Sequence, residues 1–277
     1  MPRVHRATFG LETCMFSPHQ MHAESALTLA ASGAMAALAH NEMSLQSMIQ
    51  KHGLGLVVLS ADVEYDSRLT FFSAPSIVTD SQVTLRDDGK ILVFRSRHSV
   101  SGDKGISIYV KVRPIKLSGG AALDAEPSVI DGELRARVAA DELEADVPTR
   151  ALQAQIDSWL QGAEKLGGGE HPLFIGRSDC ELADQWRFVR LPTLVATARE
   201  QLAFSGARHL TVGMKSPLRS FRGEYFRPMF FGDRGRIDIQ AFKKEERTFI
   251  IYRVLGALVP GAAEDSRPLC ALAAEVF

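Results

Sequence analysis

Two stretches of this chain share a spaced motif, and a long-period internal repeat constrains a fold more than any local pattern does. Residues 72–85 and residues 225–239 each hold an aromatic residue three before a proline and an aspartate five after it. The matched residues are Phe72, Pro75 and Asp80 in the first stretch, and Tyr225, Pro228 and Asp233 in the second. An alternating strand pattern follows each proline. The repeat predicts a duplicated domain in which the two prolines superpose and the two aspartates superpose.

The flanks of the two stretches agree with a duplication. Residues 25–53 are rich in alanine and leucine and contain no proline, which predicts a largely buried helix that ends or kinks at His40 and Asn41. Residues 191–202 place Pro192 in a first helical turn. A hairpin pattern and a last strand follow each stretch, at 82–95 and 106–112 in the first half and at 236–252 and 269–276 in the second. Each half is therefore predicted as a strand, a long helix and about four antiparallel strands.

A change of composition separates the halves. From residue 118 to residue 146 the chain turns to glycine, alanine and acidic residues, and Gly167-Gly-Gly169 follows an amphipathic stretch at 149–166. Trp159 in that stretch needs cover, so its helix is expected to lie across a sheet. These features predict a first domain at 1–117, a linker with its own short helix at 118–170, and a second domain at 171–277.

Composition indicates an ordinary globular protein. The formal net charge is −1 and 45% of the residues are hydrophobic, which argues against a nucleic-acid or lipid-surface binder. The N-terminus lacks the apolar run of a signal peptide, and no apolar stretch is long enough to cross a bilayer, so a cytoplasmic location is expected. The cysteines, Cys14, Cys180 and Cys270, have no C-x-x-C spacing, which predicts buried, reduced thiols and no metal site.

A long helix followed by a strongly twisted antiparallel sheet, twice over, resembles a double hot-dog protein of the thioesterase/dehydratase superfamily. The aromatic-x-x-Pro element followed by aspartate looks like the family's P-x-x-x-G-D strand start. The segment from Phe16 to Glu24 lies where many members carry a D-x-x-G-H-x-N loop before the hot-dog helix. The resemblance implies an α+β fold of two tandem hot-dog domains that form an intramolecular pseudo-dimer.

The same resemblance implies chemistry on an acyl thioester, carried by coenzyme A or by the phosphopantetheine arm of an acyl-carrier protein, with no other cofactor. In such folds the thioester carbonyl meets the N-terminus of the long helix. Backbone N–H groups and the positive end of the helix dipole there stabilise a developing oxyanion.

At the first helix start the sequence offers His19, His22 and Glu24 as catalytic candidates. His22 matches the family histidine best, because it lies just before the helix, and Glu24 is the acid that could replace the family's absent aspartate. Either side chain suits a general base for attack of water, or a proton shuttle for dehydration. The alternative is that Glu24 only complements the helix dipole.

The second copy offers Asp184 as its working acid, with no histidine in the loop. One active half and one structural half is therefore expected, with the reverse assignment open. Arg219, Arg222 and Arg227 are predicted to meet the phosphates of coenzyme A or the acidic surface of a carrier protein. A solvated strand face explains the same arginines without a ligand.

Three functions follow from these residues. The first is an acyl-thioester hydrolase. The second is a dehydratase or an acyltransferase/decarboxylase of a polyketide or fatty-acid-like pathway. The third is a non-catalytic acyl-binding or scaffold protein, which the missing aspartate favours. The expected partners are acyl-CoA or an acyl-carrier protein, with no nucleic acid and no membrane, and the chain is expected to act as a monomeric pseudo-dimer or a homodimer.

Overall fold

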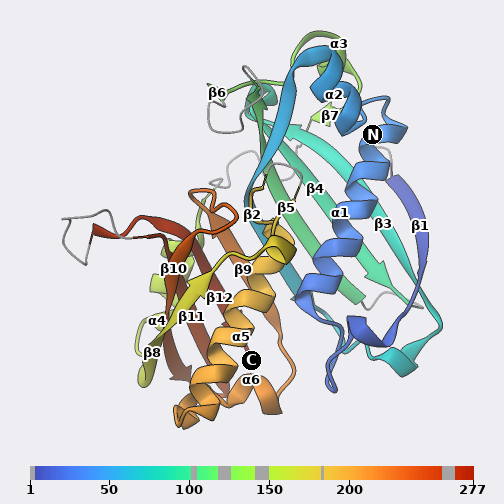
Figure 1. Ribbon diagram of the computed structural model, residues 1–277. Helices are drawn as coiled ribbons and strands as arrows, with labels where there is room; N and C mark the ends of the chain where they lie inside the picture. Colours follow the sequence, from blue (N-terminus) through green and yellow to red (C-terminus); the bar gives the residue numbers. More distant parts are fainter. Residues whose placement is uncertain (1–3, 101–104, 118–125, 141–149, 182–183, 258–265) are drawn as a thin grey trace. The chain divides into compact units, whose positions relative to one another are not determined.

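The computed structural model divides the chain into two compact units, Met1–Thr149 and Arg150–Phe277, which are described separately below. The structure describes residues 4–100, 105–117, 126–140, 150–181, 184–257 and 266–277 (Figure 1).

Unit 1 is built from a long helix and five main antiparallel strands. Its elements are β1 (Val4–Gly10), α1 (Ala23–His40), α2 (Leu45–His52), β2 (Leu54–Tyr65), β3 (Ser76–Arg86), β4 (Ile91–Ser99) and β5 (Gly105–Lys116), with short pieces β6 (Glu126–Pro127), α3 (Gly132–Ala136) and β7 (Ala139–Ala140). The strands lie in the order β1-β3-β4-β5-β2, so the first two strands of the chain lie at opposite edges. In Figure 1, α1 crosses one face of this sheet.

The small residues of α1 let it lie close to the sheet. A Cβ atom at Gly33 would lie 2.3 Å from Ser81 Oγ on β3, which only a glycine avoids. The helix ends as the sequence predicts, because the Asn41 side chain donates to Ala37 O at 2.8 Å and Glu42 takes a left-handed φ of 56°. The chain then starts the separate helix α2, capped by Ser44.

Unit 2 repeats this order of elements. Its elements are α4 (Leu152–Leu160), β8 (Glu164–Phe174), α5 (Leu191–Phe204), α6 (Val212–Lys215), β9 (Ser220–Tyr225), β10 (Arg234–Lys244), β11 (Arg247–Leu255) and β12 (Leu269–Val276). The strands lie in the order β8-β10-β11-β12-β9. Within the unit, each strand has the same neighbours as its counterpart in unit 1. Helix α5 takes the place of α1 against the sheet (Figure 1).

Matching hydrogen bonds fix which residues of the two units correspond. In unit 1 the N–H of Leu11, just after β1, donates to Pro75 O at 3.1 Å. In unit 2 the N–H of Ile175, just after β8, donates to Asp233 O at 2.9 Å. Pro75 therefore corresponds to Asp233, and the strands that follow them start at matched positions.

The predicted superposition of Pro75 on Pro228 and of Asp80 on Asp233 is wrong. Instead, Asp80 pairs with β1 at the place where Asp238 pairs with β8, so Asp80 corresponds to Asp238. The loop between the second and third strands spans residues 66–75 in unit 1 and 226–233 in unit 2, so the proline ends the first loop but lies early in the second. The duplication holds, and the shared spacing marks different positions in the two copies.

The predicted linker is not a separate segment where the structure describes it. Gly167-Gly-Gly169 lies inside β8. At each of these glycines, an atom of another residue lies close to where a Cβ atom would be. Side chains at Gly167 and Gly169 would approach His209 and Leu202 to within 2.8 and 2.9 Å. Residues 118–125 and 141–149 of that linker lie outside the described residues.

Helix α4 belongs to unit 2 and covers the sheet face opposite α5, as the need to bury Trp159 predicts. Trp159 stacks on Phe249 with ring centroids 5.8 Å apart. The first N–H groups of the helix, those of Ala151 and Leu152, donate to Glu224 Oε1 of β9 at 2.6 and 2.9 Å. Glu224 is 5% exposed, so it binds the positive end of the helix dipole out of contact with water.

The sheet face beneath the long helix carries different buried polar groups in the two units. In unit 2, Arg199 of α5 pairs with Glu275 and with Tyr252, and all three are at most 4% exposed. Burial, followed by the charge of Glu275, raises the pKa of Tyr252 well above its ordinary value. The protonated phenol therefore donates to Glu275 and completes the network.

In unit 1 the buried polar group beneath the helix is His98. Its Nε2 lies 2.9 Å from Ala26 O in the first turns of α1, and its Nδ1 lies 2.8 Å from Thr79 Oγ1. Because a carbonyl only accepts, Nε2 carries the proton and Nδ1 accepts from the threonine hydroxyl. Burial, opposed by the bond to Ala26, lowers the pKa of His98 to about 4.

The depressed pKa of His98 makes unit 1 sensitive to acid. The unfolded histidine, with a pKa of about 6.5, takes up its proton first, so stability is complete above that pH and falls as the pH drops toward about 4, by about 3 kcal/mol in all. We expect His98→Gln to reduce this slope in urea unfolding measured at several pH values. His52→Gln, at an exposed histidine, is the control. Parallel curves for His98→Gln and the parent would contradict this account.

The Glu224 cap makes α4 a part of unit 2 that one substitution can loosen. We expect Glu224→Ala to lower the free energy of unfolding by about 1–3 kcal/mol, because two buried helix N–H groups lose their acceptor. Trp159 fluorescence should shift toward the solvent-exposed wavelength before global unfolding. Glu246→Ala in the exposed β10–β11 turn is the matched control. Identical melting of the two variants would show that the cap contributes nothing.

No helix among the described residues is long and apolar enough to span a bilayer.

Candidate functional site

The loop between β1 and α1 is held by backbone hydrogen bonds that place the predicted residues at the helix start. The N–H of His22 donates to Met15 O at 2.9 Å, and the N–H of Met21 donates to Leu69 O at 2.8 Å. Ser17 Oγ accepts the N–H groups of His19 and Gln20 at 3.2 and 3.1 Å. These bonds fix the course of the chain into α1, so the side chains of the loop project from a defined backbone.

His22 is the N-cap residue of α1, and its side chain does not accept a helix N–H. The imidazole is exposed, and Glu24 follows it in the first turn. The first bond of the i to i−4 ladder that involves the cap residue runs from Ala26 N to His22 O at 3.0 Å, so the N–H groups of the first helical turn lie ahead of that ladder. The α1 start therefore combines helix N–H donors, an imidazole and a carboxylate.

His19 lies three residues before His22 and is half-buried in the same loop. The structure thus brings His19, His22 and Glu24 to one helix start, as the sequence predicts. Their roles stay predictions.

Tyr65 is a residue of this site that the sequence reasoning missed. Its hydroxyl donates to Met21 O at 2.9 Å from the end of β2. In unit 2 the hydroxyl of Tyr225, at the end of β9, donates to Phe188 O at 2.8 Å. A tyrosine at the end of the second strand thus braces the helix-start loop in both units. A search of the repeat for matched tyrosines would have found it.

The helix start of unit 2 has the same backbone frame and different side chains. The N–H of Trp186 donates to Met229 O at 2.9 Å, and the N–H of Arg187 donates to Asp179 O at 2.7 Å. Arg187 therefore occupies the position of His22. The Asp179 carboxylate is buried, and it accepts the N–H of Gly176 and the guanidinium of Arg190, each at 3.0 Å.

Asp184, the predicted acid of unit 2, lies in an exposed turn with a left-handed φ of 56°. Its carboxylate pairs with Arg177, whose guanidinium lies 4.0 Å from the centroid of the Phe231 ring. Asp184 is thus held by a cation on the loop surface. Its catalytic role stays a prediction.

The three predicted phosphate-binding arginines do not form one cluster. Arg219 and Arg227 are exposed, and their N–H groups bind Val276 O and Cys270 O at opposite ends of β12, which places them roughly 20 Å apart along the strands. Arg222 lies between them and donates to Gln155 of α4 at 2.7 Å. Its role in docking α4 is a structural one that the sequence did not reveal.

The prediction of buried cysteines is wrong for Cys14, which is exposed in the loop after β1. Cys180 is partly buried and Cys270 is buried, and burial raises the pKa of both thiols. A thiol with a raised pKa is a weak nucleophile at neutral pH. Among the described residues, no group of three or more His, Cys, Asp or Glu side chains is placed to hold a metal ion.

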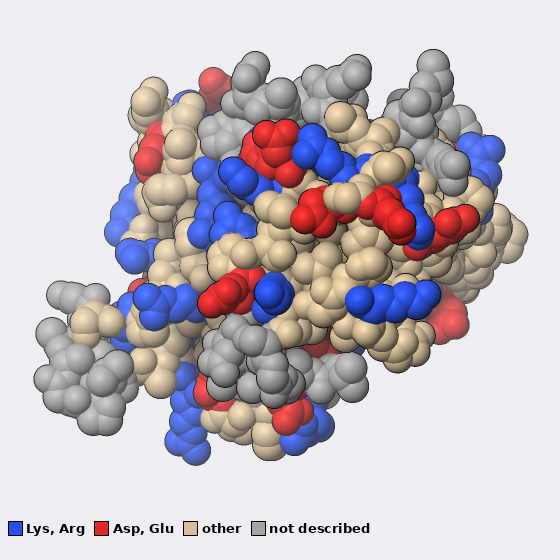
Figure 2. Space-filling model, turned by 90° about the horizontal axis from the view of Figure 1, so that it is seen from above, with Lys and Arg blue, Asp and Glu red and all other residues tan. Residues whose placement is uncertain are grey.

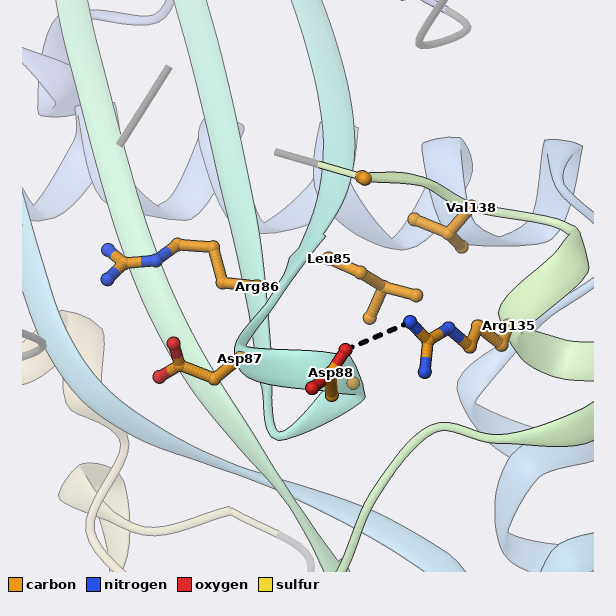
Figure 3. A pocket seen from close by; sticks show the side chains of 8 residues that line it. Leu85, Arg86, Asp87, Asp88, Arg135 and Val138 are labelled. Atoms are coloured by element: carbon orange, nitrogen blue, oxygen red, sulfur yellow. Dashed lines mark hydrogen bonds and ion pairs between the residues drawn. The ribbon is translucent and has the colours of Figure 1, made fainter. Parts of the chain in front are cut away.

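A pocket of about 260 Å³ lies at the β3–β4 turn of unit 1, remote in sequence from every predicted site residue. Figure 3 shows Asp88 and Arg135 joined across one side of it, while Arg86 points away from that pair. Asp87 and Asp88 have φ values of 49° and 52°, which aspartate adopts in tight turns. The predicted Asp-Gly hairpin is therefore confirmed. The pocket lies at the tip of this hairpin.

Charged side chains of both signs are interspersed on the face drawn in Figure 2. Among the ion pairs, Arg6 of β1 pairs with Asp80 of β3 across the strands at 2.7 Å, and Arg236 pairs with Asp238 two residues along the same strand β10 at 2.7 Å. The two aspartates are the corresponding residues of the two units, so each third strand carries an ion pair at the same place.

Three solved structures match the chain over nearly its whole length. The first is a putative oleoyl thioesterase from Lactobacillus plantarum, with a TM-score of 0.70, 10% identity, and coverage of 99% of this chain and 96% of that one. The second is an acyl-ACP thioesterase from Bacteroides thetaiotaomicron, with a TM-score of 0.64, 10% identity and coverage of 99% and 97%. The third is a 12:0-ACP thioesterase from Umbellularia californica, with a TM-score of 0.66, 13% identity and coverage of 99% and 93%.

No family model and no curated protein matches the sequence. At 10–13% identity the three structures establish the fold. The predicted α+β fold of two tandem hot-dog units is therefore confirmed, and the chain has the fold of these thioesterases.

Proposed function

We propose that the protein is an acyl-thioester hydrolase whose substrate is carried by coenzyme A or by an acyl-carrier protein. The observation that carries this proposal is the match of both units, in one chain, to three solved thioesterases. Two of those proteins are named for acyl-ACP substrates. We propose a cytoplasmic location, in keeping with such carriers, and an intramolecular pseudo-dimer of the two units.

The α1 start supplies the groups that thioester hydrolysis requires. Helix N–H groups at Ala23 to Ser25 would stabilise the oxyanion that forms when the oxygen of water bonds to the thioester carbonyl carbon. His22 or Glu24 would take the proton of that water. The C–S bond then breaks, and the pantetheine sulfur leaves as a thiol when the same base returns the proton. The proposed base and the N–H donors both lie at one helix end.

Unit 2 fits the role of the structural half. At the position of His22 it carries Arg187, whose guanidinium offers hydrogen-bond donors and no acceptor for a proton. The reverse assignment, with Asp184 as the base, requires release of its ion pair with Arg177. Arg219 and Arg227, both exposed, are the proposed contacts for the phosphates of coenzyme A.

The same helix start could support dehydration or acyl transfer in a polyketide or fatty-acid-like pathway, and the product distinguishes them. Incubation with a panel of acyl-CoAs and acyl-carrier-protein thioesters, followed by mass spectrometry, should yield free acid and free thiol. A dehydrated chain or a chain moved to another acceptor would overturn hydrolysis in favour of those reactions. An unchanged panel would favour a non-catalytic acyl-binding protein.

Substitution of the proposed base tests the site. We expect His22→Ala or Glu24→Gln to lower kcat by roughly two orders of magnitude, since general-base catalysis contributes about that much, with little change in Tm. His52→Ala, at an exposed histidine of α2, should retain full activity. Loss of activity in step with loss of Tm would assign His22 and Glu24 to the helix cap instead.

A further inference from the structure

Phe72 is the most exposed large apolar side chain among the described residues, at 93% of its free area. It lies in the loop between β2 and β3, together with the partly buried Phe71. Because so little of its area is removed from water, the Phe72 side chain gains little hydrophobic free energy from the folding of unit 1. Its exposure therefore calls for an explanation outside the folding of the chain.

The loop presents Phe72 from a fixed backbone. Thr70 and Ser73 form a reciprocal capping box around the short 3-10 turn at Phe71–Ser73. The ring of Phe71 packs edge-to-face on Phe72 at 5.5 Å and on Phe16 at 5.9 Å. Three aromatic rings thus form a continuous row that ends in solvent, with the outermost ring supported by its neighbours.

This aromatic row borders the proposed active site. Phe16 belongs to the helix-start loop that also holds His22, and Leu69 in the Phe72 loop accepts the N–H of Met21. A macromolecule that contacts Phe72 would therefore lie beside the α1 start.

The loop that holds Phe72 also carries charged residues, and one of them presents a positive charge to solvent. Asp66, in the same loop, is paired with Arg97 at 2.9 Å. Arg68 is exposed, and no ion pair of its guanidinium occurs among the described residues. An exposed cation beside an exposed aromatic ring is a combination that suits a partner with an acidic rim around an apolar contact.

We propose that Phe72 and Arg68 form a docking surface for an acyl-carrier protein, which places its thioester arm at the start of α1. This inference rests on the proposed function, because it takes the carrier as the source of the substrate. Phe72 would fill an apolar depression between helices of the carrier, and Arg68 would meet its acidic rim. Exposed aromatic residues at fixed positions dominate the binding energy of such contacts.

The corresponding loop of unit 2 explains why the docking surface is assigned to unit 1. There Phe231 is 46% exposed, and the guanidinium of Arg177 covers one face of its ring at 4.0 Å. Arg177 is in turn neutralised by Asp184. Because Met229 takes the place of Leu69, Phe231 corresponds to the partly buried Phe71. Gly232 corresponds to Phe72, so the exposed ring of Phe72 has no counterpart in unit 2.

The test compares one acyl chain on two carriers. We expect Phe72→Ser to raise KM for the acyl-carrier-protein thioester about tenfold, and to leave KM for the coenzyme A thioester within about twofold. Phe204→Ser is the matched control, since Phe204 is 77% exposed at the end of α5 and lies in the other unit. Both variants should keep the parent Tm, because neither side chain is buried. Equal increases in KM on both carriers would overturn carrier docking and assign Phe72 to the acyl chain or the arm.

Binding separates this proposal from the proposed function. Holo-acyl-carrier protein without an acyl chain should bind the parent and the Phe204→Ser variant alike, and bind Phe72→Ser about tenfold more weakly. Arg68→Glu should weaken binding most at low salt, as a screened charge contact requires. If the parent hydrolyses thioesters but shows no saturable binding, or binds as Phe72→Ser does, the docking surface is wrong. Retention on phospholipid vesicles that Phe72→Ser abolishes, with carrier binding unchanged, would replace the carrier by a membrane.

Discussion

The placement of the first strand beside the third is the constraint on which each unit depends. Because β1 pairs with β3 while β2 pairs with β5, the chain between β1 and β2 must cross the whole sheet. A helix is the only regular element that satisfies its own backbone groups during such a crossing. The crossing helix must also lie close to the strands, which explains the run of small residues in α1 and the glycine that faces Ser81. In unit 2 the same crossing is made by α5, and the glycines that leave room for its side chains lie on β8, β9 and α6 instead.

The crossing helix buries polar groups that tie it to the sheet, and the two units solve this differently. In unit 1 a neutral histidine, His98, joins the first turns of α1 to Thr79. In unit 2 the charged pair of Arg199 and Glu275 does so, with Tyr252 as a further donor. A buried ion pair stabilises a fold mainly while both charges and their hydrogen-bond partners are present. A buried neutral histidine loses its stabilising contact when it is protonated. The helix of unit 1 is therefore tied to its sheet by a neutral group and the helix of unit 2 by a charged network, although the strand orders are the same.

The order of elements along each half was predictable from sequence, because hairpins carry turn residues and the flanks of the repeat agree. The register was not. The aromatic-x-x-Pro spacing falls at the end of one loop and early in the other, and the hydrogen bonds and strand pairing of the structure reveal which residues correspond. The glycines at 167–169 were interpreted as a linker, since composition cannot distinguish flexible glycine from glycine required by a neighbour. The site residues at 19–24 were found because they adjoin a helix with a clear start. Tyr65 and Arg222 were missed, because their contacts join segments far apart in the sequence.

The two helix starts show where a duplicated fold of this kind is free to diverge. Their backbone frames agree bond for bond, from Met21 with Leu69 in unit 1 to Trp186 with Met229 in unit 2. The frame is required by the fold, since it turns the chain from the edge strand into the crossing helix. The side chains that project from it are not required, and they differ: His22 in one unit and Arg187 in the other. Chemistry that needs a base can therefore persist at one start while the other start keeps only the frame. The same reasoning applies to the loop behind each start, where Phe71 and Phe231 correspond and only unit 1 adds an exposed ring, that of Phe72.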